Sequence, residues 1–252
     1  MPPGSRPEPT KPEASPALDP ELAEDWRSQV LEASHSGAHA VKTYSRLAPV
    51  YEVWARLTES KARARVLELA DPKDGESILE VATGTGVQLR ELAGRNPSGR
   101  TVGIELSDGM FERTRRRLVS AGLVDRIELL LADALDMPFE DESFDLITNS
   151  YMLDLLARKQ IPLALEEMKR VLRPGGRLVL SNMTKAEKTR HGLWDWLYAH
   201  GLGVTANCRG VLAVPVLTEL GFTDLHREYL AQMMFPTEIV FARKPGSKPR
   251  SG

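Results

Sequence analysis

Residues 77–89, with the sequence SILEVATGTGVQL, restrict the possible folds of this chain more than any other stretch. A short apolar run with strand character ends at Ala82, a Gly-Thr-Gly turn follows, and an amphipathic helix begins near Val87. Such a turn lets backbone N–H groups and the positive end of a helix dipole face a ligand. Gly84 and Gly86 permit positive φ angles and close approach, where a side chain would obstruct. The stretch therefore predicts a ligand site at a junction between a strand and a helix.

Two acidic residues and the glycine spacing indicate what this turn binds. Glu80 lies near the carboxyl end of the first predicted strand, at the edge where open α/β sheets bind ligands. Glu105 ends the next strand-like run, TVGIE, where a carboxylate can accept hydrogen bonds from both hydroxyls of a ribose. The dinucleotide fingerprint G-x-G-x-x-G would need a small residue at the position of Leu89. The pattern favours a nucleoside cofactor that is not a dinucleotide, with a purely structural strand–helix turn as the alternative.

Strand-like and helix-like segments alternate between residues 75 and 183. The expected strands are 77–82, 101–105, 126–131, 144–149 and 176–182, and the expected helices are 87–94, 108–121 and 160–171. This alternation predicts an α/β fold, doubly wound, with a mostly parallel sheet. A helix at 211–220 and two further runs at 223–231 and 233–243 predict a terminal hairpin.

The segments on either side of this core differ from it in character. Seven of the 17 prolines fall within residues 1–20, which we expect to be a disordered tail. Residues 21–74 carry helical apolar patterns and are expected to form a lid. The core is expected to span 75–243, with the aromatic-rich segment 184–220 as a helical cap, and 244–252 is expected to be a second tail.

Composition argues against several classes of protein. A net charge of −2 gives no general reason to expect nucleic acid or an anionic membrane as a partner. No apolar run approaches the roughly 20 residues that span a bilayer, and no secretory signal pattern is present, so we expect no stable membrane insertion and a cytoplasmic location. Cys208 is the only cysteine and the five histidines are scattered, so neither a disulfide nor a metal site is predicted.

Five blocks, in order along the chain, resemble those of the class I S-adenosylmethionine-dependent methyltransferases. They are Glu80–Gly86 as motif I, Gly103–Ser107 at the end of strand two, Leu131–Asp145 around the adenine, Asp145–Tyr151 as motif IV, and Arg170–Gly176 before strand five. The resemblance spans Tyr44 to Met183 and is greatest to the ubiquinone/menaquinone-biosynthesis methyltransferases and their small-molecule relatives. It implies S-adenosylmethionine as the cofactor and a seven-stranded sheet in the order 3-2-1-4-5-7-6.

The resemblance also implies which residues hold the cofactor. Motif I would contact its methionine part, and Glu105 its ribose hydroxyls. Asp133 and the Ala134 N–H would hydrogen-bond the adenine. The full set of expected cofactor-binding residues is Tyr44, Glu80, Ala82, Thr83, Gly84, Gly86, Glu105, Leu106, Met110, Asp133, Ala134, Asn149 and Ser150.

Several of these residues have a structural alternative. Glu105 could instead cap the following helix together with Ser107, and Asp133 could be a turn residue. For Asn149 a loop hydrogen bond and a cofactor contact are equally favoured. Tyr44 is as readily explained by packing in a core as by a place in a lid.

The acceptor and the catalytic groups are less specified. Ala82 replaces the usual first glycine of motif I, a change small enough to be tolerated. Residues 151–155 do not reproduce the segment that follows motif IV in the quinone enzymes, so the sequence predicts the cofactor but not a quinone acceptor. Aromatic residues near 194–198 suggest a small acceptor of hydrophobic or aromatic character, and packing in a core explains them equally well. The candidate general bases are His191, His200, Asp154 and Tyr151. The alternatives are a structural role for the histidines and an acceptor, such as an amine, thiolate or enolate, that needs no base.

Two further hypotheses stay open. The first is an NAD(P)-dependent oxidoreductase on a similar sheet, which Leu89 and the terminal hairpin disfavour. The second is a non-catalytic cofactor-binding protein, which the intact glycine turn and the two acidic residues disfavour. The sequence does not specify the oligomeric state.

Overall fold

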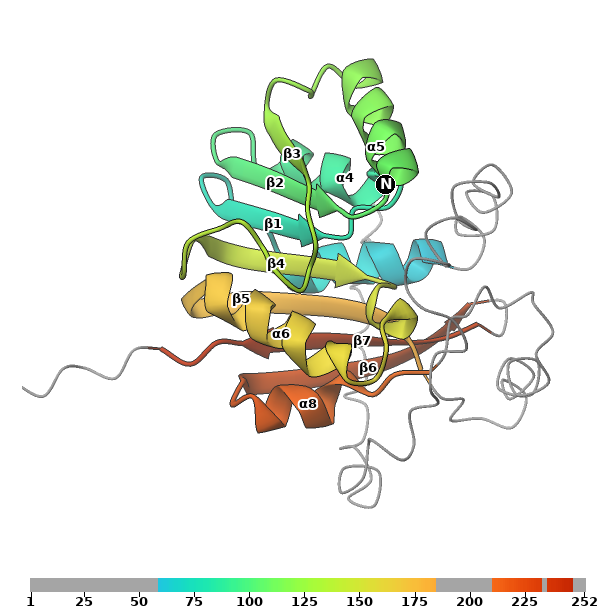
Figure 1. Ribbon diagram of the computed structural model, residues 1–252, viewed down its shortest axis with the longest axis vertical. Coiled ribbons are helices and arrows are strands. Elements are labelled where there is room, and N and C mark those ends of the chain that lie inside the picture. The colour runs from blue at the N-terminus through green and yellow to red at the C-terminus, as the bar shows by residue number, and fades with distance from the viewer. Residues whose placement is uncertain (1–58, 185–209, 233–234, 247–252) are drawn as a thin grey trace, which may run out of the picture.

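The computed structural model describes residues 59–184, 210–232 and 235–246, which form a seven-stranded sheet with helices on both faces (Figure 1). The strand order is β3-β2-β1-β4-β5-β7-β6. β7 is antiparallel to its neighbours β5 and β6, and the other pairs are parallel. The strands are β1 (Ser77–Val81), β2 (Arg100–Glu105), β3 (Ile127–Leu131), β4 (Phe144–Ser150), β5 (Leu172–Met183), β6 (Thr223–Gln232) and β7 (Phe235–Arg243). The predicted fold class, strand order and terminal hairpin are confirmed.

Two sets of helices cover the sheet. The helical residues 59–70, with α4 (Val87–Arg95) and α5 (Asp108–Ser120), pack on one face, and α6 (Gln160–Val171) and α8 (Ala213–Glu219) pack on the other. Neighbouring strand residues point to opposite faces. Ile78 therefore joins the buried cluster that contains residues 59–70, while Leu79 joins the cluster that contains α6 and α8. Because both faces are covered, four of the five residues of β1 are buried, and three of those four are apolar.

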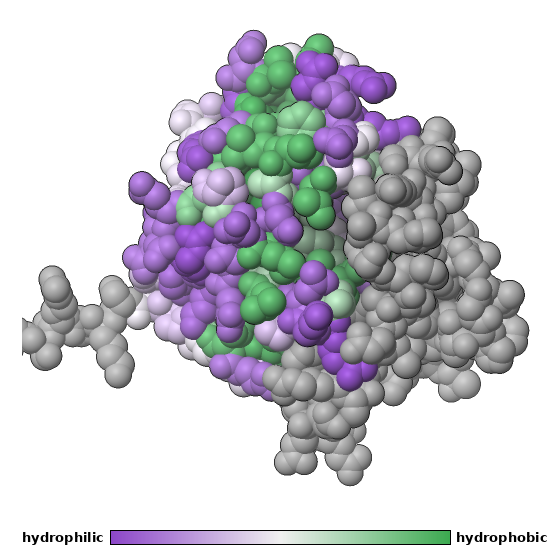
Figure 2. Space-filling view, viewed as in Figure 1, coloured by the Kyte–Doolittle hydropathy of each residue, from purple (hydrophilic) through white to green (hydrophobic). Residues whose placement is uncertain are grey.

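The face that carries α6 mixes apolar and polar side chains (Figure 2). The exposed large apolar residues of the described part are Leu106, Val119, Val124, Leu131 and Leu163. Within the ranges that the structure describes, every helix is too short or too polar to cross a bilayer.

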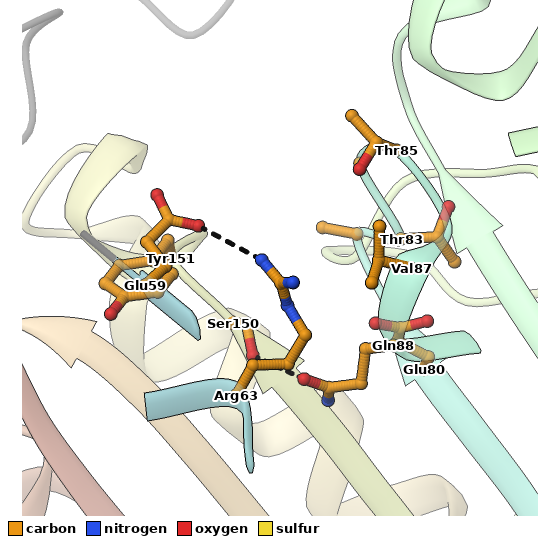
Figure 3. Close-up of a pocket in the computed structure, with 11 residues that line it drawn as sticks. Glu59, Arg63, Glu80, Thr83, Thr85, Val87, Gln88, Ser150 and Tyr151 are labelled. Atoms are coloured by element: carbon orange, nitrogen blue, oxygen red, sulfur yellow. Dashed lines mark hydrogen bonds and ion pairs between the residues drawn. The ribbon is translucent and has the colours of Figure 1, made fainter. Parts of the chain in front are cut away.

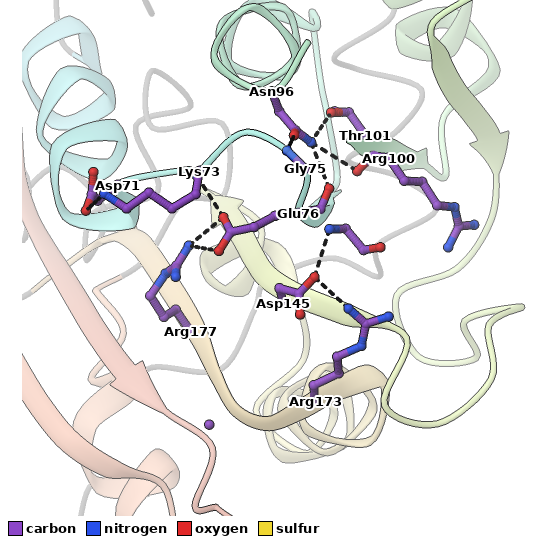
Figure 4. Close-up of polar contacts among 12 residues, drawn as sticks. Asp71, Lys73, Gly75, Glu76, Asn96, Arg100, Thr101, Asp145, Arg173 and Arg177 are labelled. Carbon is purple, nitrogen blue, oxygen red and sulfur yellow. Dashed lines mark hydrogen bonds and ion pairs between the residues drawn. The ribbon is translucent and has the colours of Figure 1, made fainter. Parts of the chain in front are cut away.

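Charged side chains fix the amino edge of the sheet, opposite the edge where the site lies (Figure 4). Glu76 accepts two hydrogen bonds from Arg177, at 2.8 and 2.9 Å. Asp145 accepts one from Arg173 at 2.6 Å and one from the Ser77 N–H at 2.9 Å. Asp145 therefore ties β4 to β1 and to the start of β5, which is a structural role.

The largest difference from the predicted elements is at the start of β5. We expect a turn through residue 175 and a strand from residue 176, whereas the strand begins at Leu172. Leu172 pairs with Phe144, and the pairing register then shifts before Leu146. The Gly175 N–H donates to the Lys244 carbonyl at 2.9 Å, which extends the pairing with the chain after β7. Gly175 and Gly176 thus belong to an irregular start of β5 rather than to a free turn. The residue that pairs with Gly175 there, Lys244, lies about 70 residues later in the chain.

Several predictions concern residues outside the described ranges. These are the tail at 1–20, the part of the lid before residue 59, most of the 184–220 cap and the end of the chain. Tyr44, His191 and His200 fall there, so their expected roles stay predictions.

Candidate active site

The loop between β1 and α4 has the left-handed backbone that its glycines suggest. Gly84 has a φ of 56° and Gly86 a φ of 72°. A Cβ on Gly84 would meet no atom within 4 Å, whereas a Cβ on Gly86 would lie 2.7 Å from the Thr114 Cγ2. Gly84 therefore borders open space, and Gly86 is required by packing against α5. Ala82 also adopts a positive φ of 58°, which a residue with a Cβ does at a cost of about 1–2 kcal/mol.

Glu105, at the end of β2, holds this loop in place. Its Oε2 accepts a hydrogen bond from the Gly84 N–H at 2.8 Å, and its Oε1 accepts one from the Ser107 N–H at 2.9 Å. The side chain is 7% exposed. Burial raises the pKa of the Glu105 carboxyl, and the two backbone donors oppose that rise. The contact with Ser107 is the helix-capping interaction that was the alternative to a ribose contact for Glu105. Each carboxylate oxygen keeps a second lone pair that can accept a hydrogen bond from a ligand.

A pocket opens between the glycine loop, the end of β4 and the helical residues 59–70 (Figure 3). Three buried polar groups on its walls have no hydrogen-bond partner among the described residues: the Glu80 Oε2, the Thr83 Oγ1 and the Gln88 Nε2. Buried polar atoms in folded proteins are nearly always paired. These atoms are therefore available to hydrogen-bond a polar ligand in the pocket.

Glu80 forms part of the pocket wall and is 3% exposed. Burial raises its pKa well above the ordinary value for a glutamate, while the nearby Arg63 guanidinium and the Leu89 backbone N–H oppose that rise. A ligand that brings a cation or a hydrogen-bond donor to this buried carboxyl would stabilise its ionised form.

Ser150 and Asn149, at the end of β4, have different roles. The Ser150 hydroxyl donates to the Gln88 Oε1 at 3.2 Å and accepts from the Ser181 hydroxyl at 3.0 Å, so Ser150 joins the pocket wall to β5. The Asn149 Nδ2 donates to the Val81 carbonyl at 2.8 Å. Asn149 is fully buried and is not among the residues that line the pocket, which favours the structural alternative for it.

Tyr151 lines the pocket with a positive φ of 55°. Its hydroxyl lies 2.9 Å from the Thr237 Oγ1, in a hydrogen bond to which either group can donate. Burial raises the pKa of the Tyr151 phenol well above its usual range. A phenol that is harder to ionise is a poor general base near neutral pH, so this geometry disfavours Tyr151 as the base. Asp154 lies in the short 3-10 helix η1 (Leu153–Leu155), is fully buried and is not part of the pocket wall.

The residues expected around the adenine lie beyond the ends of β2 and β3. The Asp133 Oδ1 accepts a hydrogen bond from the Leu135 N–H at 2.9 Å, which is the turn contact given as the alternative for this residue. The contact between Asp133 and the adenine stays a prediction. Leu106 is 54% exposed although it is apolar, whereas Met110 is buried in α5. An exposed leucine beside Glu105, the residue expected to contact the ribose, is suited to cover a flat aromatic base.

Two pocket residues, Glu59 and Arg63, are absent from the expected set. They lie one helical turn apart at an i, i+4 spacing, and their side chains form an ion pair at 4.0 Å. The sequence signal is weak, because charges at this spacing are also typical of solvated helix faces. Gln88 is also new, and the one available signal was a polar residue in the first turn of the helix after motif I. Among the described residues, no group of three His, Cys, Asp or Glu side chains is arranged to hold a metal ion.

The fold and this site together define a class. A sheet in the order 3-2-1-4-5-7-6, with a glycine loop after β1 and a carboxylate at the end of β2, is the architecture of the S-adenosylmethionine-dependent methyltransferases. Residues 78–176 match the family described as "Methyltransferase domain".

Two curated relatives place the chain within this class. It is 32% identical over 207 residues to the ubiquinone/menaquinone biosynthesis C-methyltransferase UbiE of Paracoccus denitrificans, with 79% of this chain and 77% of that enzyme covered. It is 40% identical over 114 residues to the demethylmenaquinone methyltransferase of Symbiobacterium thermophilum, a match that spans 45% of each chain. The chain belongs to the family of ubiquinone/menaquinone biosynthesis methyltransferases, whose cofactor is S-adenosylmethionine.

A solved structure supports the fold alone. The crystal structure of the [4+2]-cyclase SpnF superposes with a TM-score of 0.66 at 18% identity, over 86% of this chain and 99% of that one. Because its title names a cyclase, the shared fold does not by itself decide the reaction.

Proposed function

We propose that this protein transfers the methyl group of S-adenosylmethionine to a small acceptor of apolar or aromatic character. The observation that carries the proposal is the pocket beside the glycine loop, where Glu80, Thr83 and Gln88 present buried polar atoms that no other described residue hydrogen-bonds. Val87 and the Tyr151 ring form apolar parts of the same wall. The names of the relatives, a quinone C-methyltransferase and a demethylmenaquinone methyltransferase, make a reduced quinone the first acceptor to test.

The residues of this chain would position the cofactor as follows. The loop 82–86 and the pocket behind it would hold the methionine part, and Glu105 the ribose. Leu106, Met110, Asp133 and Ala134 would surround the adenine. When bound, the cofactor supplies a methyl group already activated by its sulfonium. The main task of the protein is then to orient the acceptor toward that group, an effect that lowers a barrier by roughly 7–11 kcal/mol.

The geometry does not favour the oxidoreductase hypothesis. Leu89 is fully buried, and its Cδ2 lies 2.6 Å from where a Cβ on Gly103 would stand. The helix after the glycine loop is thus packed onto β2 through a large side chain at the position where the dinucleotide fingerprint needs a small residue.

Two measurements test the proposed function. In calorimetry, S-adenosylhomocysteine should bind in the micromolar range, whereas NAD and NADP should not bind. With S-adenosylmethionine, a reduced naphthoquinone should gain one methyl group, detected by mass spectrometry, in a panel that includes catechols and simple amines. Binding of a dinucleotide in place of S-adenosylhomocysteine would refute the cofactor. Binding without methylation of any acceptor would support the non-catalytic hypothesis instead.

A Gly84→Ala variant tests the site with a matched control. Gly84 and Gly122 both have positive φ angles, 56° and 67°, and neither would bring an added Cβ within 4 Å of another atom. Each substitution to alanine should lower the free energy of unfolding by about 1–2 kcal/mol. Only the change at Gly84, which lines the pocket, should also weaken S-adenosylhomocysteine binding, because its methyl group would occupy ligand space. Equal affinities for the two variants would place the ligand elsewhere.

A further inference from the structure

One residue of the pocket wall, Tyr151, has a backbone conformation that its side chain does not favour. Its φ is 55°, and five residues other than glycine have a positive φ in the part of the chain that the structure describes. Three of them are exposed acidic residues, Asp71, Glu142 and Asp224. The other two, Ala82 and Tyr151, line the pocket. Because a positive φ is rarest for bulky side chains, Tyr151 is the clearest outlier of the five.

Contacts from two other strands hold Tyr151 in this conformation. Its N–H donates to the Ser181 carbonyl of β5 at 2.8 Å, and its hydroxyl lies 2.9 Å from the Thr237 Oγ1 of β7. The ring also packs on Phe235 in a tilted arrangement, with 6.0 Å between the ring centroids. A glycine or an asparagine would adopt this φ at less cost. The turn after β4 therefore does not itself require an aromatic residue, and strain that is held in this way is typical of functional sites.

Tyr151 lies across the pocket from Thr83 and Thr85 of the glycine loop (Figure 3). In the sheet, β2 carries Glu105 and β1 leads into the glycine loop, whereas Tyr151 follows β4 and is bonded to β5 and β7. A cofactor with its ribose at Glu105 and its methionine part at the loop would lie over the half of the sheet from β2 to β1. The Tyr151 end of the pocket is thus the end that faces the acceptor.

The ring, rather than the hydroxyl, is the part of Tyr151 that can contact an acceptor. The hydroxyl is already hydrogen-bonded to Thr237, which is fully buried. The side chain as a whole stays partly exposed and lines the pocket. Aromatic rings favour offset-stacked or edge-to-face contacts with other aromatic rings, beyond the gain from burying their area. Because Tyr151 is held at both its N–H and its hydroxyl, little further freedom is lost when a ligand packs on the ring.

From this arrangement we infer that Tyr151 is a specificity-determining residue for the acceptor, and that its ring selects a flat aromatic molecule by stacking. The inference rests on the proposed function, because it assigns a residue to the acceptor of that reaction. It narrows the acceptor from a small apolar molecule to an aromatic one. The competing explanation is that Tyr151 only packs against the buried apolar cluster beneath the pocket, as Phe241 of β7 does.

The test compares two ligands with the same carbon skeleton. 1-Naphthol is flat and aromatic, whereas decahydro-1-naphthol keeps the skeleton and the hydroxyl group but has no π face. Each is titrated by calorimetry into protein saturated with S-adenosylhomocysteine. The wild-type protein should bind 1-naphthol about tenfold more tightly than the saturated analogue, the scale of one stacking contact. Tyr151→Phe keeps the ring and should keep this preference, whereas Tyr151→Leu should bind the two ligands within about twofold of each other.

Phe241→Leu is the matched control. Phe241 and Tyr151 are both partly buried aromatic residues packed against the same apolar cluster, but Phe241 does not line the pocket. Both leucine variants should lower the urea midpoint of unfolding, because each removes a packed ring. Only Tyr151→Leu should lose the preference for 1-naphthol. A purely structural role for Tyr151 would move the unfolding midpoint but not the ratio of the two affinities.

Three results would overturn the inference. They are a preference for 1-naphthol that persists in Tyr151→Leu, an equal loss of that preference in Phe241→Leu, and a wild-type protein that binds both probes equally or binds neither. Failure of the proposed function is observed separately, as the absence of methylated product from every acceptor. The probe titrations do not involve methyl transfer, so the two failures are distinguishable.

Discussion

Replacing Glu105 by alanine should reduce the affinity for S-adenosylhomocysteine by about 1–3 kcal/mol, or roughly 5-fold to 150-fold. The carboxylate has two functions that this change removes together. It accepts the N–H groups of Gly84 and Ser107, and it is the expected partner of the ribose hydroxyls. Without it two backbone donors lose their acceptor, so the free energy of unfolding should also fall by about 1–3 kcal/mol. Calorimetry and chemical denaturation measure the two effects separately.

A ligand change separates the ribose contact from the support of the loop. The wild-type protein should bind S-adenosylhomocysteine more tightly than its 2′,3′-dideoxy analogue, and Glu105→Ala should bind the two with nearly equal affinity. The variant Glu105→Gln keeps the size and one acceptor oxygen, so it should be intermediate in both stability and binding. If the preference for the hydroxylated ligand survives in the alanine variant, Glu105 supports the loop but does not contact the ribose.

Local sequence patterns were sufficient for most of the fold. The boundaries of β1, α4 and α5 depend on hydrophobic periodicity and on the glycine turn, which are properties of neighbouring residues. The strand order needed more than local pattern and came from the resemblance to the methyltransferases. The start of β5 differs because the Gly175 N–H bonds to Lys244, a partner that no local pattern identifies.

The candidate site also contains residues that local sequence identifies and residues that only the packing of distant segments brings in. The residues of the loop and Glu105 could be identified because they follow strands directly and sit at a defined edge of the sheet. Arg63 could not, since its place in the pocket depends on how the helix before β1 packs across the sheet. Glu105 was identified for its expected ribose contact, whereas its bond to the Gly84 N–H emerges only when the end of β2 and the loop after β1 are placed side by side.

Gly86→Ala should be the most destabilising substitution in the glycine loop, at about 2–5 kcal/mol of unfolding free energy. Two costs add at this position. Gly86 has a φ of 72°, and an added Cβ would lie 2.7 Å from the Thr114 Cγ2 and 2.9 Å from its Oγ1. Thr114 cannot move aside freely, because it is fully buried and its hydroxyl donates to the Gly84 carbonyl at 2.9 Å. Urea denaturation of Gly86→Ala and Gly84→Ala should therefore differ, since Gly84 shares the backbone strain but not the steric conflict.

The steric part of this effect can be isolated with a second substitution. Thr114→Ser removes the Cγ2 methyl group and keeps the hydroxyl that bonds to the loop. In the double variant Gly86→Ala with Thr114→Ser, unfolding free energy should recover by about 1 kcal/mol relative to the sum of the single changes, as expected for residues in direct contact. The strain from the positive φ and the close contact with the Oγ1 would remain, so recovery should be incomplete. Strict additivity would mean that the Thr114 Cγ2 methyl group contributes nothing to the cost of the Gly86→Ala change.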